Sequence, residues 1–207
     1  MSGENWGFRA GLDRFTLQDA LELFQGAGAD RMPGRIIFIV LANSLQHQWL
    51  KKHNVPAENI EVESSDTGAA INRAIAKCNQ GDGSTTFGYA NDVIVLGSEL
   101  PVVTTKVTVP LALSGLTIQG TVDSVLYCST SIDMIEVNAY RCNIRDIMFY
   151  TSKSSHVGKA IHLNTTSSWS KVERCQFLGY SQDLQYGVYV TDAEFFEVRN
   201  CLFEDCP

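Results

Sequence analysis

The sequence repeats a short apolar pattern at an almost constant interval, and this repeat restricts the fold more than any other feature. Three segments have an apolar residue, two variable residues, a second apolar residue, one variable residue and a phenylalanine: 144–149, 172–177 and 198–203. They follow one another at intervals of 28 and 26 residues. A second set of alternating segments advances by 26 and 27 residues and consists of 135–137, 161–163 and 188–190. Two sets that advance by nearly the same step indicate one repeated structural unit.

A unit of this length predicts short strands that stack in register. Each strand can pair with its counterpart one unit later, at the spacing of roughly 4.8 Å that paired strands adopt. Equivalent side chains then form interior columns, and the predicted columns are Ile144, Val172 and Val198; Ile147, Cys175 and Cys201; and Phe149, Phe177 and Phe203. Stacked phenylalanines and small thiols can fill a narrow interior without large voids.

Charged residues occupy the variable positions of the same repeat. Arg145, Glu173 and Arg199 alternate in sign at equivalent positions, and Asp146 is equivalent to Arg174. In-register stacking favours such opposite charges over like charges. We therefore expect Asp146 to pair with Arg174 and Glu173 with Arg145, in exposed contacts that each stabilise by roughly a few tenths of a kcal/mol. These carboxylates are predicted to be structural rather than catalytic.

The segments around these repeats predict a mainly β protein with two unequal parts. Residues 66–207 are predicted to form a parallel β-helix of about four coils, whose first and less regular coil includes 93–96, 107–109 and 116–118. In DTGAAINRAIAKC, at 66–78, the apolar residues form one stripe, which predicts a helix capped by Thr67.

Residues 1–65 lack the repeat and predict a small α/β segment. Thr16 and Asp19 form a capping-box pattern before an amphipathic stretch that ends at Gly26. The apolar run IIFIVL, at 36–41, predicts a strand that is buried on both faces. A second helix is predicted from Leu45 to Lys52, before Asn54 and Pro56.

Composition excludes several classes of function. The net charge of -7, with only 16 lysines and arginines and no basic cluster, argues against nucleic-acid binding. No apolar run approaches the length of about 18 residues that a membrane span needs, and the N-terminus, MSGENWGFRAGLDRF, does not resemble a signal peptide. The 6 cysteines include no C-x-x-C pair, so we expect reduced thiols rather than disulfides. His47 and His53 have no other ligand types nearby, and no metal or cofactor is expected.

The order of motifs from residue 66 onward resembles a known superfamily. DTGAAINRAI at 66–75, a glycine-rich loop, DVIVL at 92–96, LALSGLTIQG at 111–120 and the later apolar-x-x-Cys-x-Phe segments are similar to the pectate-lyase-like right-handed β-helix superfamily. The resemblance implies that helix 67–78 caps the N-terminal end of the β-helix, where strand edges would otherwise be unpaired. Within the superfamily, the chain is similar to β-helical virion proteins of tailed bacteriophages: tailspikes, head fibres and capsid decoration proteins.

This resemblance implies a non-enzymatic virion structural protein, assembled in the host cytoplasm. Residues 1–65 are then the segment that attaches to a capsid or tail component. Other virion proteins and further copies of the chain, as a homotrimer, are the expected partners, and host surface polysaccharide is a further candidate. The sequence ends at Pro207, soon after Phe203, without an evident cap. We therefore expect that end, or one flank, to pack against other subunits.

The alternative function is a polysaccharide depolymerase or lyase on the same scaffold, because one fold can serve both roles. Glu136 and His162 are the candidate catalytic pair, since equivalent outward positions bring them within reach of acid–base chemistry. Tyr189 follows them in the column, and no second carboxylate is expected in the neighbouring coils. A solvated face without catalysis is therefore the favoured interpretation of this pair.

Outward aromatic side chains are a further candidate binding feature. They are Trp169, Tyr180, Tyr186 and Phe195. Aromatic rings in such positions can stack on sugars, but they equally mark protein–protein contacts. The contact with another protein is the favoured interpretation.

Overall fold

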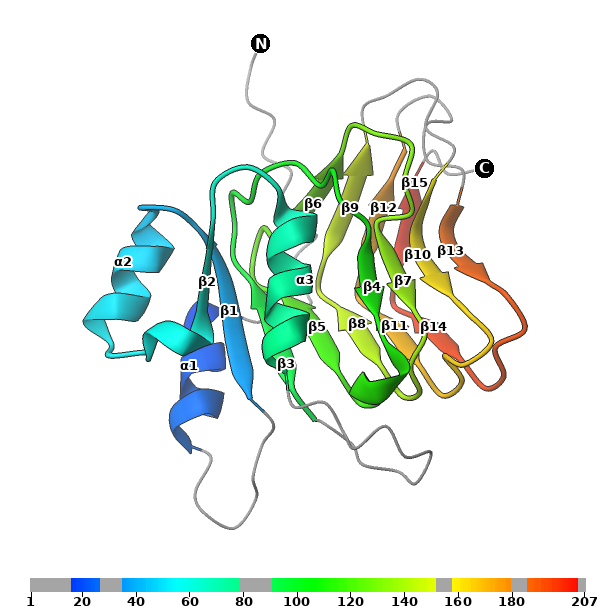
Figure 1. Cartoon of the computed structure of the whole chain (residues 1–207). Helices are drawn as coiled ribbons and strands as arrows, with labels where there is room; N and C mark the ends of the chain where they lie inside the picture. Colours follow the sequence, from blue (N-terminus) through cyan, green and yellow to red (C-terminus); the bar gives the residue numbers. More distant parts are fainter. Residues whose placement is uncertain (1–15, 27–34, 79–90, 152–157, 180–185, 205–207) are drawn as a thin grey trace.

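The computed structural model describes residues 16–26, 35–78, 91–151, 158–179 and 186–204, which are drawn in colour in Figure 1. The helices in these ranges are α1 (Leu17–Gly26), α2 (Leu45–Lys52) and α3 (Thr67–Lys77), with short 3-10 turns η1 (Ala57–Asn59) and η2 (Leu111–Leu113). Parallel strands in three sheets make up most of the rest, which confirms the prediction of a mainly β protein.

Sheet A is the largest of the three sheets. Across the sheet it contains β14 (Glu197–Arg199), β11 (Lys171–Glu173), β8 (Asn143–Arg145), β5 (Thr117–Gly120), β3 (Val93–Leu96), β1 (Ile36–Leu41) and β2 (Ile60–Glu63). Sheet B contains β15 (Leu202–Glu204), β12 (Gln176–Leu178), β9 (Met148–Thr151) and β6 (Val125–Cys128). Sheet C contains β13 (Tyr186–Val190), β10 (Lys159–Leu163), β7 (Ile135–Val137) and β4 (Val107–Val109).

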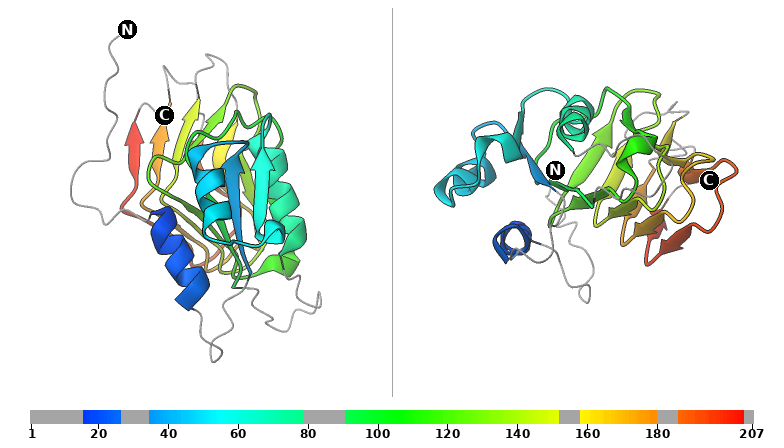
Figure 2. Two further views of the ribbon diagram at one scale, coloured as in Figure 1. Left: turned by 90° about the vertical axis from the view of Figure 1, so that its left-hand side faces the viewer. Right: turned by 60° about the horizontal axis from the view of Figure 1, so that its bottom comes forward.

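The chain enters these sheets in a repeating order. From β4 to β15 it passes through sheets C, A and B in turn and then returns to sheet C. Successive strands of each sheet therefore lie side by side, as the progression from green to red in Figures 1 and 2 shows. The arrangement is compatible with a β-helix-like parallel fold.

The register of the strands confirms two of the predicted columns, although their last members, Val198 and Phe203, are 37% and 47% exposed. Phe177 is paired with Phe149 in one neighbouring strand and with Phe203 in the other. The ring centroids of Phe149 and Phe177 lie 5.2 Å apart, and those of Phe177 and Phe203 lie 4.7 Å apart, with nearly parallel planes. In sheet A, Val172 pairs in the same way with Ile144 and Val198.

Residues with a left-handed backbone conformation form the corners between sheets. This feature was not predicted from the sequence. Each corner between sheets A and B has one residue with a φ between 50° and 66°, and these residues are Asp123, Asp146, Arg174 and Asn200. The last three corners between sheets C and A have φ values between 52° and 65°, at Arg141, Trp169, Asp192 and Phe195. A residue with a side chain loses roughly 1–2 kcal/mol in this conformation, although Asn and Asp tolerate it better. The pairing of strands on both sides of each corner compensates for this cost.

The apolar run of β1 is buried on both faces, as predicted. Ile37 and Ile39 belong to the main core inside the three sheets. Ile36, Phe38 and Val40 face a second core, which also contains Ala20 and Leu21 of α1, Leu50 of α2, and Val55, Ile60 and Val95. Figure 1 accordingly shows α1 and α2 beside β1 and β2, away from β14.

Sheet A extends across the predicted boundary between residues 65 and 66. β1 pairs with β2 on one side and with β3 on the other, all in parallel. β2 was not predicted from the sequence, because its segment IEVE is short and half acidic. The division into two domains stays a prediction, since the sheet is shared between them.

The start of α3 differs from the prediction in its capping residue. The N-cap is Asp66 and not Thr67: Asp66 Oδ1 accepts a hydrogen bond of 2.9 Å from the N–H of Gly68. The hydroxyl of Thr67 donates instead to the carbonyl of Pro101 at 2.5 Å. Gly68 is required here, because a Cβ would lie 1.9 Å from the carbonyl oxygen of Thr105.

A buried carboxylate joins β2 to α3. Glu63 Oε1 accepts hydrogen bonds from the N–H groups of residues 64, 65 and 66, and Oε2 accepts one of 2.7 Å from Arg73. Burial by itself raises the pKa of Glu63, but the hydrogen bonds from Arg73 and from the backbone outweigh it and lower the pKa to about 2. The ionised form of Glu63 therefore stabilises the folded state.

The phenylalanine column predicts unequal effects for two similar substitutions. Phe177→Ala should lower the free energy of unfolding by about 3–5 kcal/mol, because its ring is fully buried between two others. Phe203→Ala should lower it by less than half as much, because Phe203 is 47% exposed. Urea denaturation followed by circular dichroism measures both values, and equal losses would contradict the stacked arrangement.

The Glu63 network predicts a pH-dependent contribution to stability. The pKa of Glu63 is about 2 in the folded protein, against an ordinary value of 4.5. A carboxylate with a lowered folded-state pKa stabilises fully above its unfolded pKa and loses that contribution as the pH falls toward the folded one. Wild type should therefore exceed Glu63→Gln in unfolding free energy at pH 7, and the difference should shrink between about pH 4.5 and about pH 2. Denaturation at a series of pH values tests this, and a difference that stays constant down to pH 2 would refute it.

Candidate functional site

The outer face of sheet C brings together the two residues that the sequence analysis singled out for chemistry. Glu136 on β7 is the register partner of His162 on β10, as predicted. Tyr189 on β13 is the next partner in the row, and its ring centroid lies 5.2 Å from that of His162. The predicted order of this column is confirmed.

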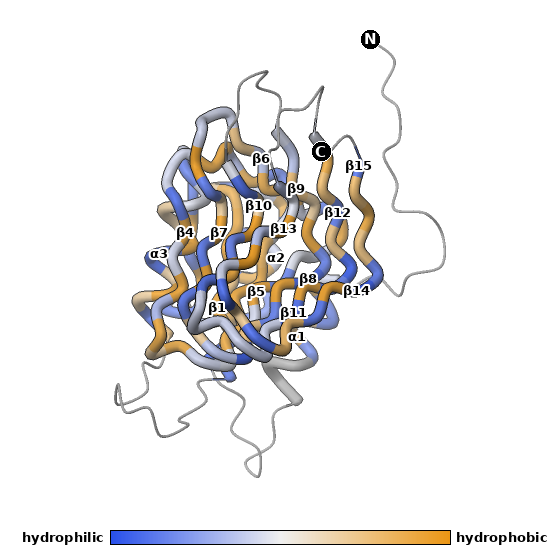
Figure 3. The backbone as a smooth tube through the Cα atoms, turned by 90° about the vertical axis from the view of Figure 1, so that its right-hand side faces the viewer, coloured by the Kyte–Doolittle hydropathy of each residue, from blue (hydrophilic) through white to orange (hydrophobic). Residues whose placement is uncertain are grey.

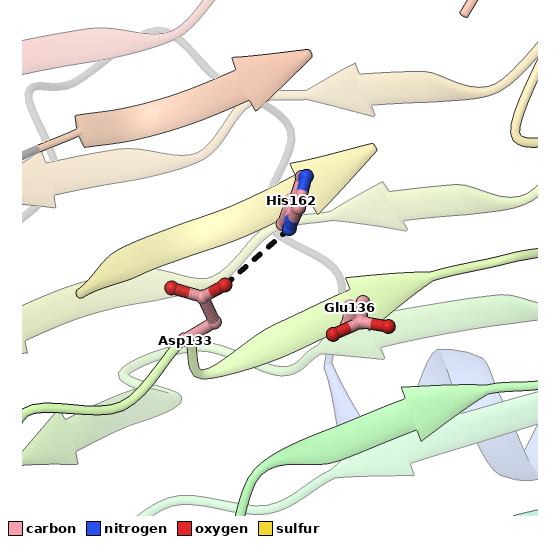
Figure 4. A group of neighbouring side chains, drawn as sticks. All are labelled: Asp133, Glu136 and His162. Carbon is pink, nitrogen blue, oxygen red and sulfur yellow. Dashed lines mark ion pairs between the residues drawn. The ribbon is translucent and has the colours of Figure 1, made fainter. Parts of the chain in front are cut away.

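Asp133 also belongs to this group, although the sequence analysis did not include it. It precedes β7, and its Oδ2 atom lies 3.3 Å from His162 Nδ1 (Figure 4). One ligand atom from each of Asp133, Glu136 and His162 falls within 4.8 Å of the others. Asp133 was missed because it lies outside the alternating segment. However, its interval of 26 residues to Lys159 is the repeat interval and was an available signal.

The imidazole of His162 is held in one orientation. Its Nε2 atom lies 2.9 Å from the hydroxyl oxygen of Thr191. Its Nδ1 atom is buried and faces Asp133, but this contact is not a hydrogen bond, and no described atom provides one. The side chain as a whole is 14% exposed. The Nδ1 atom of His162 therefore faces the carboxylate of Asp133 without a hydrogen bond.

Lysines pair with both carboxylates of the group. Lys106 Nζ lies 2.5 Å from Glu136 Oε2, and Asn138 donates a hydrogen bond of 3.1 Å to Glu136 Oε1. The hydrogen bond from Lys106 is the largest cause of a lowered pKa for Glu136, against the opposing effect of burial. Lys159 Nζ lies 3.3 Å from Asp133 Oδ2.

These charges limit the chemistry available at the site. A general acid in glycoside hydrolysis needs a raised pKa, so that its proton is retained near neutral pH. The pKa of Glu136 is shifted in the opposite direction. The arrangement is therefore suited to an ionised carboxylate that accepts hydrogen bonds or binds cations, and it is poorly suited to a proton donor.

The second pair of carboxylates from the sequence analysis has structural contacts. Arg174 forms two bonds to Asp146, of 2.6 and 2.7 Å, as predicted. The expected pair between Glu173 and Arg145 does not form. Glu173 pairs with Arg199 at 2.5 Å, while Arg145 donates to the Oε1 atom of Gln119. The prediction was wrong because Arg145 turns toward the preceding strand, where Gln119 offers an acceptor.

The outward aromatic residues fall into two groups. The rings of Trp169 and Phe195 stack at the corners between sheets C and A, with centroids 4.5 Å apart and exposures of 52% and 66%. Tyr186 lies on sheet C, with its ring centroid 5.0 Å from that of Tyr189. Tyr180 lies outside the described residues.

The remaining described histidines and cysteines lie outside the group of Asp133, Glu136 and His162. His47 is buried and accepts a hydrogen bond from the N–H of Asn43, and His53 packs against Trp49. The cysteines in the described ranges have free thiols. Cys206 lies outside those ranges. In the part of the chain that the structure describes, Asp133, Glu136 and His162 are the only group of three potential metal ligands.

Comparison of the chain with protein-family models, with curated proteins and with solved structures finds no match. Among the described helices, none has both the length and the apolar character to cross a membrane. The candidate site is therefore interpreted from its own geometry.

The pairing of Lys106 with Glu136 predicts a measurable shift in titration. Lys106→Met should raise the pKa of Glu136, because the largest cause of its lowering is removed and burial remains. Carboxyl NMR titration of Glu136 measures the change. Lys171→Met is the matched control, because Lys171 pairs with Glu197 in sheet A. An unchanged pKa of Glu136 in Lys106→Met would exclude this pairing in solution.

Proposed function

We propose that this chain is a non-enzymatic structural protein of a tailed-bacteriophage virion, as a capsid decoration protein, head fibre or tailspike-like component. In this proposal the three sheets form a right-handed parallel β-helix of about four coils, and α3 is its N-terminal cap. Residues 1–65 attach the protein to a capsid or tail component, and the β-helix is a rigid projecting module. The protein is assembled into the virion in the host cytoplasm. The sequence resemblance over residues 66–207 and the parallel sheets support this assignment.

The position of α3 supports its role as a cap. Ala70, Ile71 and Ala74 of α3 are fully buried in the same core as Val103 and Val107. Covering this core excludes water from the apolar columns at the end where the sheets begin. In the proposed β-helix, α3 therefore covers the end of the core in place of a further coil of strands.

The observation that carries the functional proposal is the apolar surface of the last described strands and the corner before them. Val198, Leu202 and Phe203 are between 37% and 47% exposed, and Figure 3 shows an apolar stretch along β15. The stacked rings of Trp169 and Phe195 add a second exposed apolar contact. Surfaces of this kind are typical of protein–protein contacts. Further copies of the chain, in a trimer, and other virion proteins are the proposed partners.

The state of the carboxylates also favours a structural role over catalysis. Glu136 is paired with Lys106, Asp146 with Arg174, and Glu173 with Arg199. The pKa of Glu136 is lowered by its hydrogen bond from Lys106, which opposes proton donation. The acidic side chains of the outer faces thus act mainly between neighbouring strands.

A polysaccharide depolymerase or lyase remains the second candidate function, with host surface polysaccharide as the substrate. The specific observation in its favour is the group of Glu136, His162 and Asp133 on one face, beside the rings of Tyr186 and Tyr189. Aromatic rings beside carboxylates are a common arrangement for sugar binding.

The structural proposal predicts that the exposed stack of Trp169 and Phe195 contributes to association. The double variant Trp169→Ser, Phe195→Ser should weaken self-association or co-sedimentation with capsids at least tenfold, with little change in melting temperature, because both rings are exposed. Leu111→Ser is the matched control, since Leu111 is 44% exposed elsewhere. Analytical ultracentrifugation and co-sedimentation with particles of the encoding phage provide the measurements.

Two outcomes would overturn the structural proposal. One is a chain that stays monomeric at micromolar concentration and does not co-sediment with the particles. The other is release of reducing or unsaturated sugars from host polysaccharide that is lost in Glu136→Gln, which would establish the enzymatic alternative.

A further inference from the structure

The geometry points to a binding site for a divalent transition-metal ion on the outer face of sheet C, with Asp133, Glu136 and His162 as its protein ligands. Their ligand atoms lie within 4.8 Å of one another. An ion at about 2.0–2.2 Å from each ligand needs ligand atoms roughly 3–4 Å apart, which follows from those bond lengths. Binding an ion therefore requires the ligand atoms to move closer together than they lie in this structure.

The environment of His162 is that of a metal-binding imidazole. Metal-bound histidines usually donate their second ring N–H to an acceptor, which determines which nitrogen faces the metal. In His162 the Nε2 atom has such a partner in the hydroxyl oxygen of Thr191, at 2.9 Å. The Nδ1 atom is buried, has no hydrogen bond among the described atoms and faces Asp133. A polar atom in this state is rare in proteins, and a metal ion at this position would satisfy it.

Each carboxylate has one oxygen held by a hydrogen bond from a backbone or amide N–H group. Asp133 Oδ1 accepts a hydrogen bond of 3.0 Å from the backbone N–H of Lys159, and Oδ2 faces His162. Glu136 Oε1 accepts one of 3.1 Å from Asn138, whose own Oδ1 accepts one of 2.6 Å from Asn164. Partners of this kind orient metal ligands and restrict their motion.

The two lysines compete with the metal ion for the remaining carboxylate oxygens. Lys106 Nζ contacts Glu136 Oε2, and Lys159 Nζ contacts Asp133 Oδ2. The side chain of Lys106 is 45% exposed, so its ammonium group can move into water when the ion binds. Removal of the competing ammonium group should therefore strengthen metal binding.

The ligand set selects the class of metal. One imidazole nitrogen with two carboxylate oxygens suits Zn²⁺, Co²⁺ and Mn²⁺. Ca²⁺ and Mg²⁺ prefer sites made entirely of oxygen atoms and water. Among the preferred ions, affinity should be higher for Zn²⁺ than for Mn²⁺, in accord with the general order for nitrogen and oxygen ligands.

Titration of the full chain with Zn²⁺, measured by calorimetry, tests this proposal. We expect one ion per chain in the wild type, with at least tenfold weaker binding in His162→Gln and in Asp133→Asn. Lys106→Met should bind more tightly than the wild type, which a purely structural role of the group does not predict. His53→Gln is the matched control, because His53 lies on another part of the surface. The affinity of this variant for Zn²⁺ should equal that of the wild type.

Two further measurements distinguish metal binding at the proposed site from metal binding by thiols and from misfolding of the variants. Cys201→Ser should bind Zn²⁺ as the wild type does, and the Co²⁺ complex should lack the near-ultraviolet absorption of cobalt–thiolate bonds. Circular dichroism of metal-free His162→Gln and Asp133→Asn should match the wild type. Absence of saturable binding, loss of binding in Cys201→Ser, or equal affinity in wild type, His162→Gln and Asp133→Asn would overturn the proposal.

Discussion

In-register pairing of parallel strands is the interaction on which the rest of this structure depends. Because each strand lies directly against its counterpart one repeat later, an inward side chain always meets an equivalent side chain. The stack of Phe149, Phe177 and Phe203 is the clearest result, with ring centroids 5.2 and 4.7 Å apart. A shift of one residue would turn every inward side chain outward, so the apolar pattern and the register stabilise each other.

The same register organises the polar outer faces. Equivalent outward positions bring opposite charges together, as in Asp146 with Arg174 and Asp133 with Lys159. Glu136 has a lowered pKa because it accepts a hydrogen bond from the positively charged Lys106. On sheet C the same register brings Glu136 beside His162, and the lowered pKa of Glu136 makes it better suited to binding a cation than to donating a proton.

The first part of the chain extends this architecture. β1 lies between β2 and β3 in sheet A and is covered by the main core on one face and by α1 and α2 on the other. The first part is thus joined to the main body by backbone hydrogen bonds within one sheet rather than by a flexible linker. This continuity fits the rigid module that we propose for the virion.

The sequence by itself determined the repeat interval, the interior columns, the buried strand of β1 and the adjacency of Glu136 and His162, because all of these follow from spacing along one repeated unit. It did not determine the left-handed corners, the cap by Asp66, the partner of Glu173 or the participation of Asp133. Those features depend on side-chain directions and on competition among several nearby acceptors. Only the tertiary structure decides such choices, because local spacing leaves several partners equally close.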